Sequence, residues 1–211
     1  MKDYRGNFEV HITVEVSGSH APLHEWCVAN DCKCVFIVLA RGTHPQQPMV
    51  SWRRGTVTLP AVLQEANSRA QELQQSGFLP IRLKIEADPD NEGIPLSDED
   101  ASNEPLGNYF EHHIKLRRQI TADHGNLLTL CLDHGAHLSR NAFRITAGGI
   151  EERFVTLRSH GIGCCQSHRR LEELRSSLEA AGEHIVEVES EYAVYDSNIA
   201  LDDGWLRSAS R

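Results

Sequence analysis

The chain has 211 residues, of which 40% are hydrophobic and 6% aromatic. This length suits one large domain or two small lobes with a buried core. Its 30 acidic and 21 basic residues give a net charge of −9, which argues against general nucleic-acid binding. No apolar run approaches the roughly 20 residues of a membrane span, and the start, MKDYRGNFEV, lacks the apolar stretch of a secretory signal. We therefore expect a soluble cytoplasmic protein without membrane contact.

In chain order, the first half predicts strand, helix, strand, strand, helix and strand. FEVHITVEV alternates apolar and polar residues, which is typical of a strand buried on one side. APLHEWCVAN has apolar residues at helical spacing, and CVFIVLARG is an apolar run that predicts a buried strand. PMVSWRRG and PIRLKIEA alternate on either side of an amphipathic helix, LPAVLQEANSRAQELQQSG. This helix should end near Gly77 and bury Val62, Ala66, Ala70 and Leu73.

The second half repeats this order. YFEHHIKLRR predicts a strand, NLLTLCLDHG a helix, and AHLSRNAFRI and ERFVTLRSHG two further strands. A second amphipathic helix, CCQSHRRLEELRSSLEAAG, precedes a last strand, HIVEVESEY. That helix should end near Gly182 and face inward through Leu171, Leu174, Leu178 and Ala181.

Four segments correspond between the halves in the same order, including FEVHITV with FEHHIKL and MVSWRRG with FVTLRSHG. The sequence therefore predicts an α+β fold, a tandem duplication of a ferredoxin-like βαββαβ unit with pseudo-twofold symmetry. We place the lobes at 1–87 and 109–192. The acidic linker at 88–108 is expected not to pack because of its charge and prolines. Residues 193–211 form a tail whose Trp205 should dock on the lobes.

Six cysteines and 12 histidines raise the question of a metal. CVANDCKC places three cysteines close together, but no second pair stands at zinc-finger spacing. Without a signal sequence, reduced thiols are expected rather than a disulfide framework. We expect neither a metal nor a cofactor. The cysteines are Cys27, Cys32, Cys34, Cys131, Cys164 and Cys165.

The strand sides opposite the helices carry similar polar residues in both halves. In a ferredoxin-like unit the first and third strands are neighbours, and both helices cover one face of the sheet. The apolar sides must therefore face the helices. In the first half, the free side presents Glu9, His11, Thr13 and Glu15 beside Ser51 and Arg53. In the second half, it presents Glu111, His113, Lys115 and Arg117 beside Thr156 and Arg158.

These residue types favour a cleft that handles anions. Arginine matches the oxygens of a phosphate or carboxylate, and histidine exchanges protons near neutral pH. We therefore predict a site for a small molecule bearing a phosphate or carboxylate. Its catalytic residues would be His11 and His113. Its anion-binding residues would be Thr13, Ser51, Arg53, Lys115, Thr156 and Arg158.

HITV resembles the H-x-T/S-x strand motif of the two-histidine phosphoesterases, the RNA ligase-like and cyclic-nucleotide phosphodiesterases. That family is also bilobal, with one motif in each lobe. The resemblance implies phosphoester hydrolysis, with His11 and His113 catalytic and Thr13 as a positioning hydroxyl. The chain departs from the pattern at Lys115, which replaces the second hydroxyl, and the motif opens each half instead of coming later. IRLKIE and VEVESEY resemble strands of the triphosphate tunnel enzymes, but the E-x-E-x-K signature is absent.

Two simpler interpretations remain open at this point. The histidines are equally consistent with solvated side chains, and the arginines with ion pairs to Glu9, Glu15, Glu187 and Glu189 on a stabilising sheet face. The competing class of function is a non-enzymatic binding or assembly protein whose open sheet faces make protein contacts. A cleft holding His11 and His113 within about 8 Å would favour chemistry.

Overall fold

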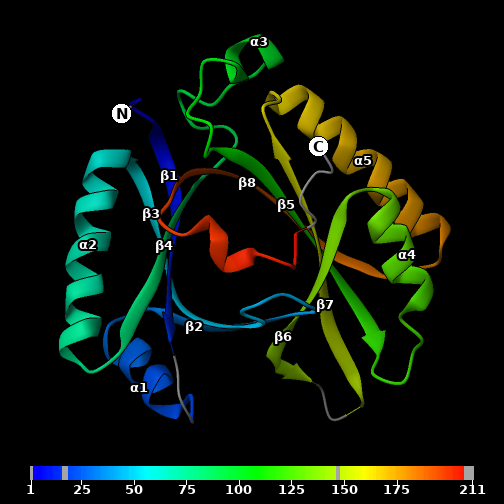
Figure 1. Ribbon diagram of the computed structural model, residues 1–211, viewed down its shortest axis with the longest axis horizontal. Coiled ribbons are helices and arrows are strands. Elements are labelled where there is room, and N and C mark those ends of the chain that lie inside the picture. The colour runs from blue at the N-terminus through cyan, green and yellow to red at the C-terminus, as the bar shows by residue number, and fades with distance from the viewer. Residues whose placement is uncertain (1, 16–18, 146–147, 207–211) are drawn as a thin grey trace.

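A computed structural model describes residues 2–15, 19–145 and 148–206, and for 142–145 the backbone alone. Its elements follow the predicted order and confirm the duplicated ferredoxin-like α+β fold (Figure 1). The first unit comprises β1 (Arg5–Glu15), α1 (Ala21–Ala29), β2 (Lys33–Leu39), β3 (Gln46–Thr58), α2 (Leu59–Gln75) and β4 (Leu79–Ala87). The second comprises β5 (Tyr109–Gln119), α4 (Gly125–Asp133), β6 (Ala136–Ile145), β7 (Ile150–His160), α5 (Cys164–Ala180) and β8 (Ile185–Asp196). A short α3 (Asp98–Ala101) joins the units, and a 3-10 turn, η1 (Ile199–Asp202), follows β8.

The two four-stranded sheets join edge to edge into one closed barrel. Its strand order over the described residues is β1-β3-β2-β6-β7-β5-β8-β4, and all the pairings are antiparallel. Within each unit the first and third strands are neighbours, as expected. The seams are β2 with β6 and β4 with β8. Figure 1 shows α1 and α2 outside one half and α4 and α5 outside the other. Both helix-free faces therefore line the interior, and the lobes share one hydrogen-bonded sheet.

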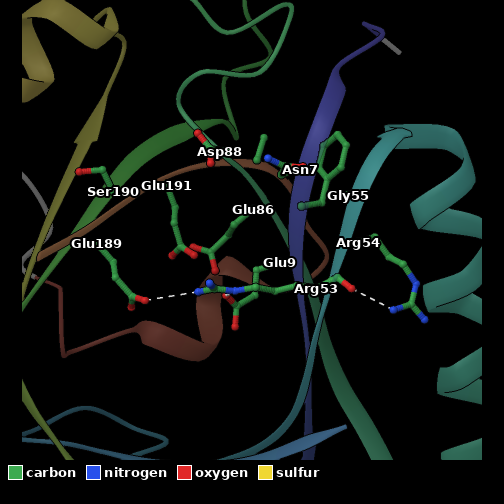
Figure 2. A pocket seen from close by; sticks show the side chains of 12 residues that line it. Asn7, Glu9, Arg53, Arg54, Gly55, Glu86, Asp88, Glu189, Ser190 and Glu191 are labelled. Carbon is green, nitrogen blue, oxygen red and sulfur yellow. Dashed lines mark hydrogen bonds and ion pairs between the residues drawn. The ribbon is translucent and has the colours of Figure 1, made fainter. Parts of the chain in front are cut away.

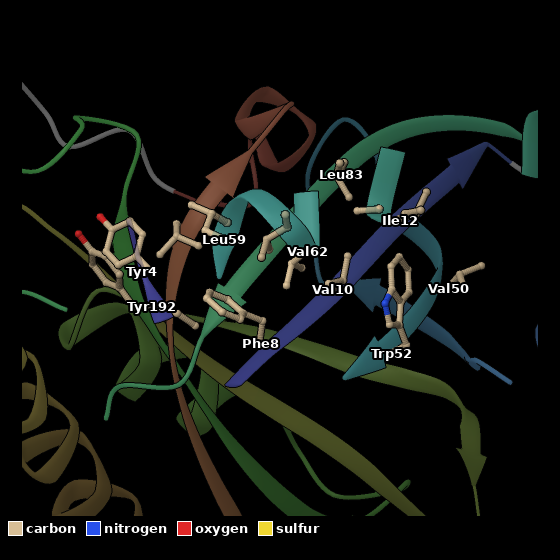
Figure 3. Packing of buried hydrophobic residues seen from close by; sticks show 14 of the residues in the cluster. Tyr4, Phe8, Val10, Ile12, Val50, Trp52, Leu59, Val62, Leu83 and Tyr192 are labelled. Atoms are coloured by element: carbon tan, nitrogen blue, oxygen red, sulfur yellow. The ribbon is translucent and has the colours of Figure 1, made fainter. Parts of the chain in front are cut away.

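Each helix pair covers its own hydrophobic core. In the first half, Val10, Ile12 and Trp52 from the strands pack with Val62 of α2 (Figure 3). In the second half, residues such as Ile114 pack with Leu171, Leu174 and Leu178 of α5. Fully burying one such side chain is worth about 1.5–3 kcal/mol. The prediction that the apolar strand sides face the helices is confirmed.

Two details of burial differ from the predictions. Ala181 is exposed because α5 ends one residue earlier, at Ala180. β2 is not fully buried, although its sequence is an apolar run. Phe36 is buried, and its ring centre lies 4.1 Å from that of His20, whereas Val35 and Ile37 are half-buried. The reason is barrel closure, which leaves the inner side of β2 facing a cavity rather than a second packed layer.

The prediction that the acidic linker does not pack is wrong. Asn91 accepts a hydrogen bond from Asn7 N at 2.8 Å and donates one to Asn7 O at 2.7 Å. Ser97 and Asp100 form a capping box at the start of α3. Pro95 O accepts from Cys164 N at 2.9 Å, which attaches the segment to α5. The polar side chains that suggested a solvated linker here cap backbone groups of both halves.

The end of the chain also differs from the expected tail. β8 continues past residue 192 to Asp196, and Ala193 and Tyr195 pair with β4 to form the seam. η1 then crosses between the two sheets (Figure 1). Trp205 is buried, and its Nε1 donates to Leu138 O at 3.1 Å, so the expected docking of Trp205 is confirmed. No helix within the described parts of the chain is long and apolar enough to span a membrane.

Candidate functional site

The barrel interior contains a cavity of about 330 Å³ lined by both halves of the chain. Of the predicted site residues, all except Ser51 line it. These are His11, Thr13, Arg53, His113, Lys115, Thr156 and Arg158. Ser51 is fully buried, and its Oγ donates to Glu9 Oε1 at 2.7 Å. The structure thus brings the predicted residues into one place, although their anion-binding and catalytic roles stay predictions.

The sequence analysis missed an apolar wall of this cavity. Three of its six side chains come from β2, whose residues alternate between the helix side and the cavity, and the others come from β3, β7 and the segment after η1. A period of two was present at 33–39, but the residues on both sides of the strand are apolar and hide it. The side chains of this wall are Val35, Ile37, Leu39, Met49, Phe154 and Trp205.

The two predicted histidines occupy equivalent positions in the two sheets. His11 lies opposite Ser51 of β3 and Lys84 of β4. His113 lies opposite Thr156 of β7 and Glu189 of β8. The duplicated sequence therefore places one histidine in the middle of each inner face.

Both histidines converge on Glu86. The Nε2 atom of His11 lies 3.0 Å from Glu86 Oε2. His113 Nδ1 shares a hydrogen bond with Thr156 Oγ1 at 3.0 Å, and its Nε2 lies 3.7 Å from both Glu111 and Glu191. Donor atoms of Glu86, His113 and Glu191 lie within 4.8 Å of one another. A single bound group could therefore contact both imidazoles through short movements.

The deep cations of the cavity are neutralised by a buried ion network. Arg158 pairs with Glu111 at 2.7 Å and with Asp202 at 3.0 Å. Lys84 bridges Glu86 and Glu111. Arg82 also contacts Asp202, at 3.1 Å. Arg158 therefore forms ion pairs, but with Glu111 and Asp202 instead of the four glutamates that the sequence suggested, and its side chain is only 4% exposed.

The shallow cations, Arg53 and Lys115, are more exposed than Arg158. Arg53 contacts Glu9 and, at 3.3 Å, Glu189. Lys115 contacts Glu187. The side chain of Arg53 is 62% exposed, and exposed pairs of this kind contribute little to stability. Arg53 and Lys115 can therefore change partners, whereas a change at Arg158 leaves two buried carboxylates with fewer partners.

Two equivalent glutamates have opposite pKa shifts. Burial favours a high pKa for Glu86, but the charges of Lys84 and His11 outweigh it and lower the pKa of Glu86 to about 2. Burial, followed by the negative charge of Glu86, raises the pKa of Glu191 well above its usual value. The carboxyl group of Glu86 therefore gives up its proton more readily than that of Glu191.

A second pocket, of about 450 Å³, adjoins the cavity and shares Glu9, Arg53, Glu86, Glu189 and Glu191 with it. Figure 2 shows the carboxylates of Glu86 and Glu191 directed toward the same space above Arg53, while Arg54 points to the opposite side of its strand. We call this the mouth pocket. It gives solvent a route to the carboxylates.

The other histidine- and cysteine-rich segments do not form part of this site. In DHGAH, His134 Nε2 contacts Ser177 Oγ at 3.0 Å, and the ring of His137 packs 5.5 Å from Trp205. In CCQSH, Cys164 Sγ lies 3.8 Å from His168 Nδ1. The six cysteines are free thiols.

No protein-family model matches the sequence, and no curated protein is detectably similar to it. Among solved structures, a protein assigned as a glycine cleavage system transcriptional repressor is 10% identical, with coverage of 90% of this chain and 97% of that chain and a TM-score of 0.25. A dye-decolorizing protein from V. cholerae is 8% identical, with coverages of 93% and 96% and a TM-score of 0.29. A protein assigned as a chlorite dismutase is 14% identical, with coverages of 96% and 97% and a TM-score of 0.28. At these TM-scores none of the likenesses bears on the site.

Proposed function

We propose that the barrel interior binds a small molecule with an apolar body and a phosphate or carboxylate group. The observation that carries this proposal is the cavity of about 330 Å³ with two unlike walls, one apolar and one charged. Small-molecule sites commonly combine an apolar lining with a few placed polar groups. The cavity volume lies at the lower end of the range for such sites, about 300–1,000 Å³.

The anionic group is expected at Lys115 or Arg53. Glu187, the partner of Lys115, and Glu189, the more distant partner of Arg53, are both more than 40% exposed, so exchanging them for a ligand anion costs little. Arg53 would keep its contact with Glu9. Lys115 also lies 5.6 Å from the ring of Phe154, at the junction of the charged and apolar walls. A ligand with both parts would span this junction.

The same cavity already holds a carboxylate of the chain itself. Asp202 accepts hydrogen bonds from Arg82 at 3.1 Å, from Arg158 at 3.0 Å and from Gln47 at 3.0 Å. Its side chain is buried. A planar oxyanion held between two guanidinium groups supports the proposed class of ligand.

Phosphoester hydrolysis is the reaction that we propose for such a ligand. One histidine would take the proton of the attacking water as its oxygen bonds to phosphorus. The other would give a proton to the leaving oxygen as the phosphorus–oxygen bond breaks. We assign the role of acid to His11, whose Nε2 lies 3.0 Å from the Glu86 carboxylate. His113, hydrogen-bonded to Thr156, would then be the base.

Binding is tested by thermal denaturation with phenyl phosphate, inorganic phosphate and benzyl alcohol, all with EDTA present. Phenyl phosphate should raise the melting temperature more than either part alone, because it contacts both walls. Saturation at about 100 times Kd would stabilise the fold by about 2.7 kcal/mol. Lys115→Gln and Arg53→Gln together should abolish the shift. The matched control is Arg54→Gln, because Arg54 pairs with Glu65 on the helix side.

The reaction is tested with bis(4-nitrophenyl) phosphate as substrate. His11→Asn and His113→Asn should each lower nitrophenolate release at least 100-fold, while the exposed His24→Asn should leave it unchanged. If phenyl phosphate shifts the melting temperature but no hydrolysis occurs, the chain is a binding protein without this activity. If neither is seen, the interior is a structural network and the assembly interpretation replaces the proposal.

A further inference from the structure

We propose that Glu86, His113 and Glu191 bind a divalent transition-metal ion, such as Mn²⁺, where the cavity meets the mouth pocket. The three residues come from β4, β5 and β8, which lie side by side in the barrel. Each offers one donor atom, and these atoms lie within 4.8 Å of one another. This proposal does not depend on the proposed function, because it concerns binding of the ion alone.

The donor set suits such an ion. An imidazole nitrogen and two carboxylate oxygens are ligands that Mn²⁺ and Zn²⁺ accept, and three protein ligands leave positions open for water. Metal–ligand bonds of about 2.0–2.2 Å put neighbouring donors roughly 3 Å apart. Side-chain rotations that close the group by an ångström or two are therefore sufficient. The sequence hides this set because its members lie on strands far apart in the chain.

The charge balance at this point leaves room for a cation. Four carboxylates meet here, those of Glu9, Glu86, Glu111 and Glu191, and three cations pair with them. Arg53 pairs with Glu9, Arg158 with Glu111, and Lys84 with Glu86 and Glu111. Among the described residues, the ion-pair partner of Glu191 is His113, at 3.7 Å. Glu191 therefore has no lysine or arginine as an ion-pair partner among the described residues.

Surrounding contacts orient two of the three ligands. The contact of His113 Nδ1 with Thr156 Oγ1 leaves Nε2 directed at the carboxylates. His11 Nε2 holds Glu86 Oε2 at 3.0 Å from the other side. Such second contacts fix ring orientation and carboxylate direction at metal sites. His11 Nδ1 is buried and has no hydrogen-bond partner within the described structure. A proton on Nδ1 would have no acceptor, so the ring N–H belongs on Nε2, which donates to Glu86.

Lys84 works against the ion, because its ammonium group contacts the same carboxylate. Glu86 has two oxygens, however, and Lys84 lies against Oε1 whereas His11 lies against Oε2. A remaining lone pair on either oxygen can bind the metal while Lys84 stays with Glu111. Access is open, since Glu86 and Glu191 also line the mouth pocket (Figure 2). A bound ion would supply positive charge to a phosphate, which the paired deep cations do not.

The experiment measures Mn²⁺ binding to the chelator-treated chain by calorimetry and by the electron paramagnetic resonance signal of free Mn²⁺. Mn²⁺ is preferred as the probe because thiolates favour softer ions, which keeps the six cysteines out of the result. We expect one ion per chain. Glu191→Gln and His113→Ala should each weaken binding at least tenfold. The matched control is Glu189→Gln, on the same inner side of β8 but outside the ligand group, which should bind as the wild type does.

Melting temperatures separate loss of the site from loss of the fold. Glu191→Gln removes a carboxylate that has no lysine or arginine partner in the described structure, so the metal-free variant should melt no lower than the wild type and should no longer be stabilised by Mn²⁺. Absence of stoichiometric binding to the wild type, or equal binding by Glu191→Gln and the wild type, would overturn the proposal. Phenyl phosphate binding in EDTA is a separate measurement, so either proposal can fail while the other stands.

Discussion

The two halves of the barrel share one backbone plan but carry different charges on their last strands. β4 pairs with β1 in the same register as β8 pairs with β5. Glu86 and Glu191 occupy equivalent positions, opposite Glu9 and Glu111. Two residues earlier on each strand, however, Lys84 in the first half corresponds to Glu189 in the second. At the next inner position Arg82 corresponds to Glu187.

This difference accounts for the ion pairs of the interior. Because the barrel is closed, the inner faces of the two halves lie across the cavity from each other. If both faces carried the same charges, like charges would meet. With cations on β4 and carboxylates on β5 and β8, the buried Lys84 reaches Glu111 of the other half. Arg53 of β3 likewise reaches Glu189. A buried charge without a partner costs several kcal/mol. Divergence of the two copies thus permits a charged interior. It also makes the cavity unsymmetrical, because carboxylates gather on β5 and β8.

Restoring the symmetry in the first half should have the largest effect. Lys84→Glu would place three buried carboxylates together, at 84, 86 and 111, where Lys84 now neutralises two. Removing one partner of a buried pair costs about 3–5 kcal/mol, and the reversed charge adds to this. We expect a chain that does not fold at pH 7, measured by circular dichroism. A folded variant with near wild-type stability would show that the two halves are not coupled through this residue.

The equivalent arginines of the two halves should differ strongly. Arg158→Met leaves Glu111 and Asp202 buried with fewer partners and should cost about 3–5 kcal/mol in urea denaturation. Arg53→Met removes a side chain that is 62% exposed, and Glu9 keeps its hydrogen bond from Ser51, so the cost should be at most about 1 kcal/mol. The sequence placed the two arginines at corresponding positions, but their burial differs. Similar costs for the two variants would contradict the assignment of one pair as buried and the other as superficial.

His112 should make the second half sensitive to acid. It occupies the register position of Val10, faces α5, and bonds to Ser190 at 2.8 Å and Ser167 at 2.7 Å. Burial, with smaller contributions from His168 and His113, lowers its pKa to about 4, although Glu111 opposes the shift. An unfolded histidine has a pKa of about 6.5, so its contribution to stability is complete above that pH and is lost as the pH falls toward 4.

Between pH 7.5 and pH 5 this group alone should lower the free energy of unfolding by about 2 kcal/mol. Urea denaturation at the two pH values measures the loss. His112→Val, which copies the first half, should remove most of the pH dependence in this range while lowering stability at neutral pH, because Ser167 loses its partner. An unchanged pH dependence in the variant would assign the acid sensitivity to other groups.

Restoring the symmetry in the second half should have the smallest effect. Glu189→Lys gives β8 the residue type that β4 has at Lys84, but Glu189 is 42% exposed and its partner Arg53 lies at the surface. We expect a change of at most about 1 kcal/mol in the free energy of unfolding. A cost comparable to that of Lys84→Glu would mean that both strand edges are equally buried in solution.

Local sequence patterns predicted most of the fold. The order of the elements, the duplication and the inward face of each strand follow from periods of two and 3.6 residues. The same periodicity placed the predicted residues on the cavity side, because polar residues at alternate positions must share a face. The strand β2 is apolar on both of its sides, so Val35 and Ile37 gave no such signal. Their place in the cavity wall was therefore not predicted.

The sequence by itself therefore determined which residues share a strand face, and with them the two hydrophobic cores and the inner position of His11 and His113. The tertiary structure decided how the faces meet. The seams β2–β6 and β4–β8 and the packing of the acidic segment join residues far apart in the chain. Such contacts depend on the closure of the whole sheet, which local periodicity does not encode. Only that closure brings Glu86, His113 and Glu191 within 4.8 Å and pairs Arg158 with Asp202.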